Sequence, residues 1–268
     1  MNDLLIPNRV NTFHRANPVA KLICMISLFM LTLFTHRLDF IFYQMTCFLL
    51  LLVFFSGHRL WKISIIMMPF LIVFLASSST MILFGKGDTI WWTWGLIRIS
   101  QESFYRGIHI GFKAVTFAAE GLLFVLTTPS VTLFYALMQK AKLPPKFAYS
   151  FMASIRLLPM IWEELQIRRN ALKIRGASSS RGGMKWIGSL KLYIVPLLVQ
   201  GIRRAHRVAV AMETKAFDGK GRRSYYYPSE YSRNDVWAIL LLCSSVGAAL
   251  LLSILLPPFG VADVRYHL

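Results

Sequence analysis

Acidic residues are scarce in this sequence, which has 12 aspartates and glutamates against 30 lysines and arginines over 268 residues. The resulting net charge of +18 accompanies 56% hydrophobic residues and a mean hydropathy of +0.53. Such a composition is too apolar for an ordinary soluble domain. The cations must therefore be segregated from the apolar stretches, as they are in a membrane protein.

Sequence signatures of catalysis and metal binding are also lacking. The three cysteines lie far apart in apolar runs without a CxxC pair, which favours packing or lipid-facing roles. The six histidines form no HxxxH or HxxE pairing, and no P-loop or Gly-x-Ser-x-Gly motif occurs. We therefore expect no catalytic residue, metal site or cofactor in this chain, and any ATP and magnesium to be bound by partner proteins.

Five apolar runs predict membrane-spanning helices, at Leu22–Thr35 (extended at its start by Val19 and Ala20), Phe40–Phe55, Ile63–Phe84, Ile108–Leu126 and Val236–Leu256. Spanning takes roughly 20 helical residues at about 1.5 Å each, so the shorter runs need flanking residues or a tilt. Residues 85–95 hold glycines, turn residues and three tryptophans, which suits a loop at the headgroup level. The predicted fold class is an all-α, polytopic membrane protein with about five transmembrane helices and long amphipathic cytoplasmic helices.

The distribution of cations predicts the orientation. Residues 140–223 hold 18 of the 30 lysines and arginines but four acidic residues, so this segment should be cytoplasmic. We expect a multi-pass protein of the cell membrane, with the N-terminus and residues 128–232 cytoplasmic and the C-terminus outside. The corresponding domains are residues 1–130 with four spans, 131–232 as a cytoplasmic helical region, and 233–268 with the last span and a tail.

The central region reads as amphipathic helices. Thr132–Lys140 predicts a short helix, and Phe147–Leu158 and Ile161–Ile174 form a longer pattern that Pro159 interrupts. Further on, one face repeats at intervals of three and four residues and predicts a seam for a partner helix; it holds Ile194, Leu197, Gly201, Ala205, Val208 and Met212. The small residues Gly201 and Ala205 allow close backbone approach and are candidate contacts to a partner subunit or to another helix.

A six-residue pattern occurs twice in this basic region, forty residues apart: Ala171-Leu-Lys-Ile-Arg175-Gly176 and Ala211-Met212-Glu213-Thr-Lys215-Ala216. Each copy closes a helical pattern with a cation and a small residue. A cation at a helix C-terminus is favoured by about 0.3–1 kcal/mol, and a glycine there can take the left-handed cap conformation. Capped helix ends would explain one copy. Two matched basic ends suggest matched sockets on a pair of acidic partner surfaces.

One carboxylate lies within an apolar stretch. Glu120 is in the fourth predicted span, and Lys113 lies seven residues earlier on roughly the same face. Carboxylates inside membranes are costly and usually functional. We expect Glu120 and Lys113 to form a structural pair or to contact a partner subunit rather than to relay protons.

The ordered set of motifs resembles the transmembrane T component of energy-coupling factor (ECF) transporters, a family that includes the Q component of cobalt and nickel importers. The resemblance covers most of the chain. It rests on Asn17-Pro18-Val-Ala-Lys21-Leu22, Pro144, Arg156-Leu-Leu-Pro159, Glu163/Glu164, Ala171…Arg175-Gly176, Pro196-Leu-Leu, Arg204-Ala205 and Ala211-Met212-Glu213-Thr-Lys215-Ala216-Phe217.

The resemblance implies a non-catalytic scaffold. In that family two cytoplasmic coupling helices end in Ala-Arg-Gly-like motifs that enter grooves of two ABC-type ATPase subunits, and a small membrane S component binds the substrate. By position, Arg175 with Gly176 marks the first docking end and Lys215 with Ala216 the second. The family commonly has Arg-Gly at the second end. Because alanine resists a left-handed turn, we expect that cap to come later, at Asp218-Gly219.

The leading hypothesis is energy coupling in an importer of a vitamin, a vitamin precursor or a transition-metal ion; thiamine or its precursor, biotin, cobalt and nickel all stay open. A conventional permease would favour more polar residues along the spans. A membrane protein that binds anionic lipid or nucleic acid through its basic region would need neither the repeated spacing nor Gly176. We expect two ATPases, an S component and the bilayer as partners, and no nucleic acid.

Overall fold

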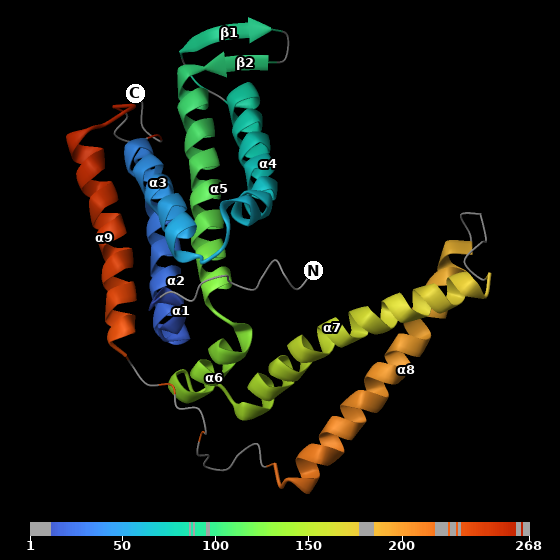
Figure 1. The fold of residues 1–268 in the computed structure, drawn as a ribbon. Helices are drawn as coiled ribbons and strands as arrows, with labels where there is room; N and C mark the ends of the chain where they lie inside the picture. The colour runs from blue at the N-terminus through green and yellow to red at the C-terminus, as the bar shows by residue number, and fades with distance from the viewer. Residues whose placement is uncertain are drawn as a thin grey trace. The chain divides into compact units, whose positions relative to one another are not determined.

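A computed structural model describes residues 12–85, 87, 89–94, 97–176, 185–217, 225, 229, 232–260 and 264. The elements in chain order are α1 (Thr12–Arg15), α2 (Pro18–Phe34), α3 (Leu38–Phe55), α4 (Leu60–Phe84), β1 (Ile90–Trp94), β2 (Ile97–Ser100), α5 (Gln101–Thr127), α6 (Ser130–Lys140), α7 (Pro145–Ile174), α8 (Lys185–Thr214) and α9 (Arg233–Leu255) (Figure 1). The chain forms two compact units. We call residues 1–136 with 229–268 the membrane unit, and residues 137–228 the central unit.

Four helices of the membrane unit, α3, α4, α5 and α9, are long and apolar enough to cross a membrane. The shorter apolar helix α2 has 17 residues and a length of about 26 Å, slightly less than a hydrocarbon core of about 30 Å. These helices confirm the predicted all-α, polytopic fold. Helix α5 begins seven residues before the predicted run because Ser100 caps it, accepting a hydrogen bond from the Ser103 N–H (3.2 Å).

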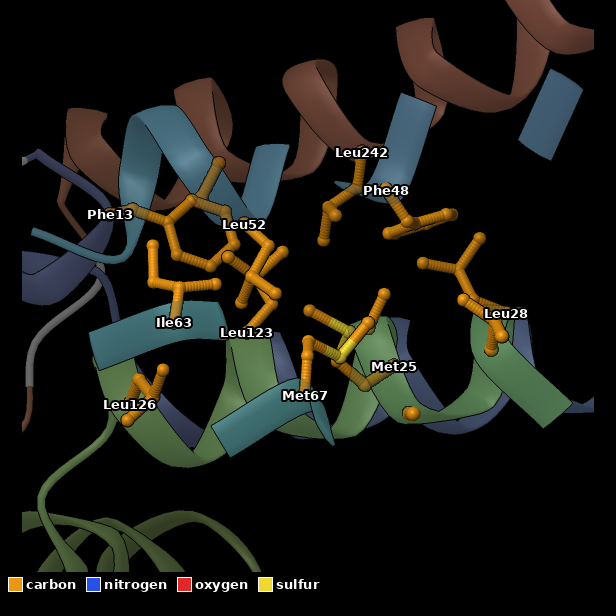
Figure 2. Close-up of a cluster of buried hydrophobic side chains, with 14 of the residues drawn as sticks. Phe13, Met25, Leu28, Phe48, Leu52, Ile63, Met67, Leu123, Leu126 and Leu242 are labelled. Carbon is orange, nitrogen blue, oxygen red and sulfur yellow. The ribbon is translucent and has the colours of Figure 1, made fainter. Parts of the chain in front are cut away.

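The core of the membrane unit lies around α5, which packs against α2, α3 and α4. Figure 2 shows side chains from α1–α5 and α9 that converge on one cluster, among them Phe13, Met25, Phe48, Leu123 and Leu242. Two glycines at GxxxG spacing bring α4 and α5 close together. A Cβ atom at Gly107 would lie 2.5 Å from the Ile82 side chain, and one at Gly111 would lie 2.6 Å from Phe74.

A two-stranded antiparallel hairpin, β1–β2, connects α4 to α5 where the sequence predicts only a loop. Its strands are rich in isoleucine and tryptophan, residue types that favour extended backbone. Trp91 and Trp92 are 58% and 63% exposed. Their exposure at the end of two membrane-crossing helices agrees with the indole preference for the headgroup level.

In the central unit, α7 is one continuous helix from Pro145 to Ile174, so the predicted interruption at Pro159 is wrong. A proline in a helix removes one hydrogen bond and can kink the helix, but it does not have to end it. Leucines, methionine and glutamates, which favour helix, flank Pro159 on both sides and carry the helix through it. Helix α8 likewise continues through Pro196.

Candidate functional site

The first copy of the repeated pattern ends α7 in a left-handed turn. Arg175 is the C-cap residue, and its N–H donates to the Ala171 carbonyl (3.1 Å). Gly176 follows with φ of +68°, and its N–H donates to the Lys173 carbonyl (3.1 Å). This hydrogen bond and the left-handed residue are those of a glycine-terminated helix cap. The left-handed cap conformation predicted for Gly176 is thus confirmed.

The second copy ends α8 in the same way, with alanine in the left-handed position. Ala216 has φ of +50°, and its N–H donates to the Glu213 carbonyl (2.9 Å). The Phe217 N–H donates to the Met212 carbonyl (2.9 Å), which completes the pair of hydrogen bonds of a Schellman motif. Ala216 thus forms the cap itself, although we expected the cap to come later because alanine resists a left-handed turn. The alternative cap, Asp218-Gly219, lies outside the described residues.

Packing of Phe217 explains how Ala216 holds this conformation. The left-handed region costs a non-glycine residue roughly 1–2 kcal/mol. Phe217 packs edge-on against Tyr149 near the start of α7, with ring centroids 5.5 Å apart and ring planes at 88°. An aromatic pair of this geometry contributes about 0.5–1.5 kcal/mol beyond its buried area, which offsets most of the backbone cost.

Helices α7 and α8 pair in antiparallel order. Near the end of α8, a groove of about 310 Å³ lies between them, lined by Tyr149, Ala153 and Leu157 of α7 and by Ala205, Val208 and Met212 of α8. Three residues of the predicted seam thus face α7. Gly201 is half-buried with open space beside its Cα. The partner helix predicted for the seam is therefore α7 at Ala205, Val208 and Met212.

A polar network joins the middle of the same two helices. Glu164 of α7 forms an ion pair with Arg204 of α8, and both side chains are about three-quarters buried or more, at 19% and 24% exposure. With the Gln200 amide nitrogen facing α7, Gln200 donates to Glu164 (2.7 Å) and accepts from Arg168 (3.3 Å). Charge-assisted contacts of this kind hold the relative register of two helices. The resemblance-derived residues Glu164 and Arg204 thus meet in space.

The antiparallel order places the two basic ends far apart. Tyr149 lies beside the end of α8 through its contact with Phe217, whereas Arg175 lies 26 residues further along α7. At about 1.5 Å per helical residue, the two ends are roughly 40 Å apart along α7. Figure 1 shows the end of α7 and the end of α8 at opposite extremes of the helix pair. One small acidic ligand cannot contact both.

Both ends present their charged groups to solvent. Arg175, Gly176, Glu213, Lys215 and Ala216 are exposed, and Ile174 next to the first end is 88% exposed. The first residue of each copy differs: Ala171 is half-buried and Ala211 is exposed, while Met212 is half-buried in the groove. The contact between Tyr149 and Phe217 was not predicted from the sequence. An apolar residue directly after a helix cap, here Phe217, often packs against a neighbouring side chain and could have indicated it.

Glu120 and Lys113 bind different partners in the membrane unit, so the structural pair is wrong as a prediction, while a contact with a partner subunit stays a prediction. The fully buried Glu120 carboxylate accepts hydrogen bonds from Thr32 of α2 and Gln44 of α3, each 3.2 Å long. Gln44 also donates to the Thr32 hydroxyl (2.6 Å), whereas the Lys113 ammonium donates to the Leu33 carbonyl (2.9 Å). Thr32 and Gln44 on neighbouring helices lie within hydrogen-bonding distance of Glu120, and they take the place of a lysine two helical turns away.

Among the described residues, no cluster of three or more histidine, cysteine or acidic side chains could hold a metal ion.

The model of the cobalt transport protein family, CbiQ, matches residues 9–226 and so includes both helix ends. The energy-coupling factor transporter transmembrane protein EcfT of Lactococcus lactis subsp. cremoris is 29% identical over 247 residues, covering 87% of this chain and 91% of the relative. The EcfT of Limosilactobacillus fermentum is 26% identical, with 65% and 68% covered. That of Streptococcus thermophilus is 23% identical, with 85% and 89% covered.

Proposed function

Because the chain belongs to the cobalt transport protein (CbiQ) family of transporter membrane components, we propose that it is the energy-coupling scaffold of an ATP-driven importer of the ECF type. The family resemblance inferred from the sequence motifs is thereby confirmed. In the proposed role, the chain links two ABC-type ATPase subunits to a membrane S component that binds a vitamin, a vitamin precursor or a transition-metal ion. ATP and magnesium are bound by the ATPases.

The observation that carries the proposal is the pair of matched helix ends. Each presents an exposed cation on a left-handed turn, Arg175 before Gly176 and Lys215 before Ala216, and the two ends lie roughly 40 Å apart along the helix pair. Two sockets on two ATPase subunits fit this arrangement. Arginine can donate two parallel hydrogen bonds to a carboxylate, whereas lysine supplies a point charge, so the two sockets should differ in detail.

An apolar stripe on α8 supports contact with an S component. Val195, Leu198, Val199 and Ile202 recur at helical spacing and are exposed, as are Leu158, Trp162 and Ile167 on α7. Patches of this kind mark protein or membrane contacts. The basic side chains of the same helices favour the cytoplasmic face, which agrees with the proposed topology in which residues 128–232 and the N-terminus are cytoplasmic and the C-terminus is outside.

The test is co-expression of the tagged chain with candidate ABC ATPases, followed by measurement of co-purification and ATP hydrolysis. Arg175→Glu and Lys215→Glu each reverse the charge of one end. Arg169→Glu and Arg207→Glu are the matched controls, because they make the same charge change at exposed positions of α7 and α8 away from the ends. We expect loss of ATPase recovery or of coupled hydrolysis in the two end variants and wild-type behaviour in the controls.

Equal loss in all four variants would favour the electrostatic alternative, in which any cation of the region matters about equally. Flotation of the wild-type chain on vesicles with and without anionic phosphatidylserine then measures lipid attraction directly. Absence of bound ATPase in the wild type would reduce the two patterns to capped helix ends. A conventional permease would transport its substrate without a separate S component.

A further inference from the structure

The start of α2 carries two polar side chains that are buried inside the membrane unit. Asn17 is 5% exposed and Lys21 is 2% exposed. The chain leaves the membrane unit after α5, through Thr127 and the first turns of α6, and re-enters it at Ser229 before α9. We call residues 127–136 the outgoing connection and residues 229–235 the returning connection. Within the membrane unit, each connection is hydrogen-bonded to a residue at the start of α2.

Lys21 binds the outgoing connection. Its ammonium donates to the carbonyl of Thr127, the last residue of α5 (3.1 Å), and to the carbonyl of Phe13 in α1 (2.8 Å). The Lys21 nitrogen also lies 5.2 Å from the centre of the Phe13 ring. The last carbonyls of a helix have no partner within the helix and carry partial negative charge. A buried ammonium at this place therefore fixes the end of α5 to the start of α2.

Asn17 binds the returning connection. Its backbone N–H donates to Asp235 Oδ1 (2.6 Å), and its side-chain amide donates to the Ser229 hydroxyl (3.0 Å). Asp235 Oδ2 accepts from the Ser232 N–H (3.0 Å) at the start of α9, so the carboxylate joins α9 to α2. The Asn17 side-chain oxygen meanwhile caps α2, accepting from the Val19 N–H (3.0 Å).

We propose that Asn17 and Lys21 are positioning residues that hold both chain connections to the central unit, so that displacement of the docking ends is passed to the membrane unit instead of being lost in loose connections. This inference rests on the proposed function. Because both groups are buried, water cannot replace their hydrogen bonds, and loss of one leaves a buried carbonyl or N–H without its partner.

If Asn17 and Lys21 had a purely structural role, the expected results would differ. Loss of their bonds would lower the thermal stability of the membrane unit and leave the response to nucleotide intact in every molecule that stays folded. A positioning role leaves assembly and ATP hydrolysis in place and weakens the response of the two connections. Hydrogen exchange of backbone amides in residues 127–136 and 229–235 reports on the connections directly.

The experiment uses the chain assembled with its ATPases and an S component in nanodiscs. Exchange is compared without nucleotide and after trapping with ATP, magnesium and vanadate, and the change at the two connections is the measured response. Lys21→Met removes the ammonium, Asp235→Ala removes the acceptor of the Asn17 N–H, and Asp235→Asn restores a side-chain oxygen. Arg59→Met is the control, because it removes an exposed cation at the start of α4.

We expect Lys21→Met and Asp235→Ala to retain bound ATPases and hydrolysis while the response at the connections falls about fivefold, the ratio that corresponds to roughly 1 kcal/mol. Asp235→Asn should recover most of the response, and Arg59→Met should match the wild type. A wild-type response in both disruptive variants would overturn the inference, as would their failure to assemble or a wild-type complex without any response. Failure of the wild type to recruit ATPases would be seen in co-purification and would instead overturn the proposed function.

Discussion

Gly176 and Ala216 adopt the same left-handed backbone conformation at the ends of α7 and α8, with φ of +68° and +50°. Only the first is a glycine, so the two turns have the same shape but different conformational cost. A Cβ at Gly176 would meet no atom within 4 Å, and the cost of alanine there is therefore backbone strain alone. The relationship makes the two ends a matched pair for substitution.

Substitution of the left-handed residue, glycine by alanine or alanine by glycine, should change the stability of the two helix ends in opposite directions. Gly176→Ala should destabilise the first turn by about 1 kcal/mol, and Ala216→Gly should stabilise the second by a similar amount. Hydrogen exchange of the backbone amide at position 176 should become about fivefold faster in the first variant, and that of Phe217 about fivefold slower in the second. Gly201→Ala in the interior of α8 is the control and should stabilise the helix slightly, because no left-handed turn is involved. A change of stability in the same direction at both ends would contradict this prediction.

The ion pair between Glu164 and Arg204 should contribute a measurable coupling energy. In a double-mutant cycle of alanine substitutions, we expect about 1 kcal/mol of coupling in the free energy of unfolding, because the pair is mostly but not fully buried. Glu163 and Arg203, their exposed chain neighbours, form the control cycle and should be additive. Coupling of equal size in both cycles would show that helix charge, rather than the specific contact, is measured.

Glu120 should be coupled energetically to Gln44 and not to Lys113. Glu120→Leu removes an acceptor that the Thr32 hydroxyl and the Gln44 amide share, and leaves them the Leu28 carbonyl and the Thr32 hydroxyl as acceptors. We expect a cost of about 1 kcal/mol, and a smaller one for Glu120→Gln, which keeps an acceptor oxygen. Thermal unfolding of the single and double variants Glu120→Leu, Gln44→Leu and Lys113→Met tests both cycles. Additivity of Glu120→Leu with Gln44→Leu, together with coupling to Lys113→Met, would restore the pairing predicted from the sequence.

His58 should contribute stability to the membrane unit that is lost as the pH falls through the ordinary histidine pKa. Burial lowers the pKa of His58, between α3 and α4, and the nearby Lys62 charge lowers it further. The unfolded chain then takes up a proton near pH 6.5 while the folded chain does not, so the free energy of unfolding decreases as the pH falls through that value. No such loss arises at higher pH, where the imidazole is neutral in both states.

Thermal unfolding between pH 7.5 and 5.5 measures this dependence. His58→Gln, which cannot titrate, should reduce the slope, and His14→Gln should reduce it as well, because burial also lowers the pKa of His14. His206→Gln, at an exposed position of α8 in the central unit, is the control substitution. An equal reduction by His58→Gln and His206→Gln would contradict the assignment to His58.

Local patterns predicted the helices well and their interruptions poorly. The five apolar runs coincide with α2, α3, α4, α5 and α9, because a segment inside a bilayer must satisfy its backbone hydrogen bonds internally. Pro159 reads as a break in isolation, yet the helix-forming residues around it carry α7 through. Ala216 reads as unsuited to a left-handed turn, and it adopts one because Phe217 packs against Tyr149, 68 residues earlier in the chain.

The sequence by itself determined the membrane class, the number of apolar helices, the basic central region and the two repeated helix ends, because each depends on composition or on spacing within a few turns. The tertiary structure decided which polar groups meet: Lys21 with Thr127, Asn17 with Asp235, and Glu120 with Gln44. These partners are separated by 76 to 218 positions, and a buried polar side chain bonds to whichever acceptor the packing of the helices brings within reach. No local pattern specifies that neighbour.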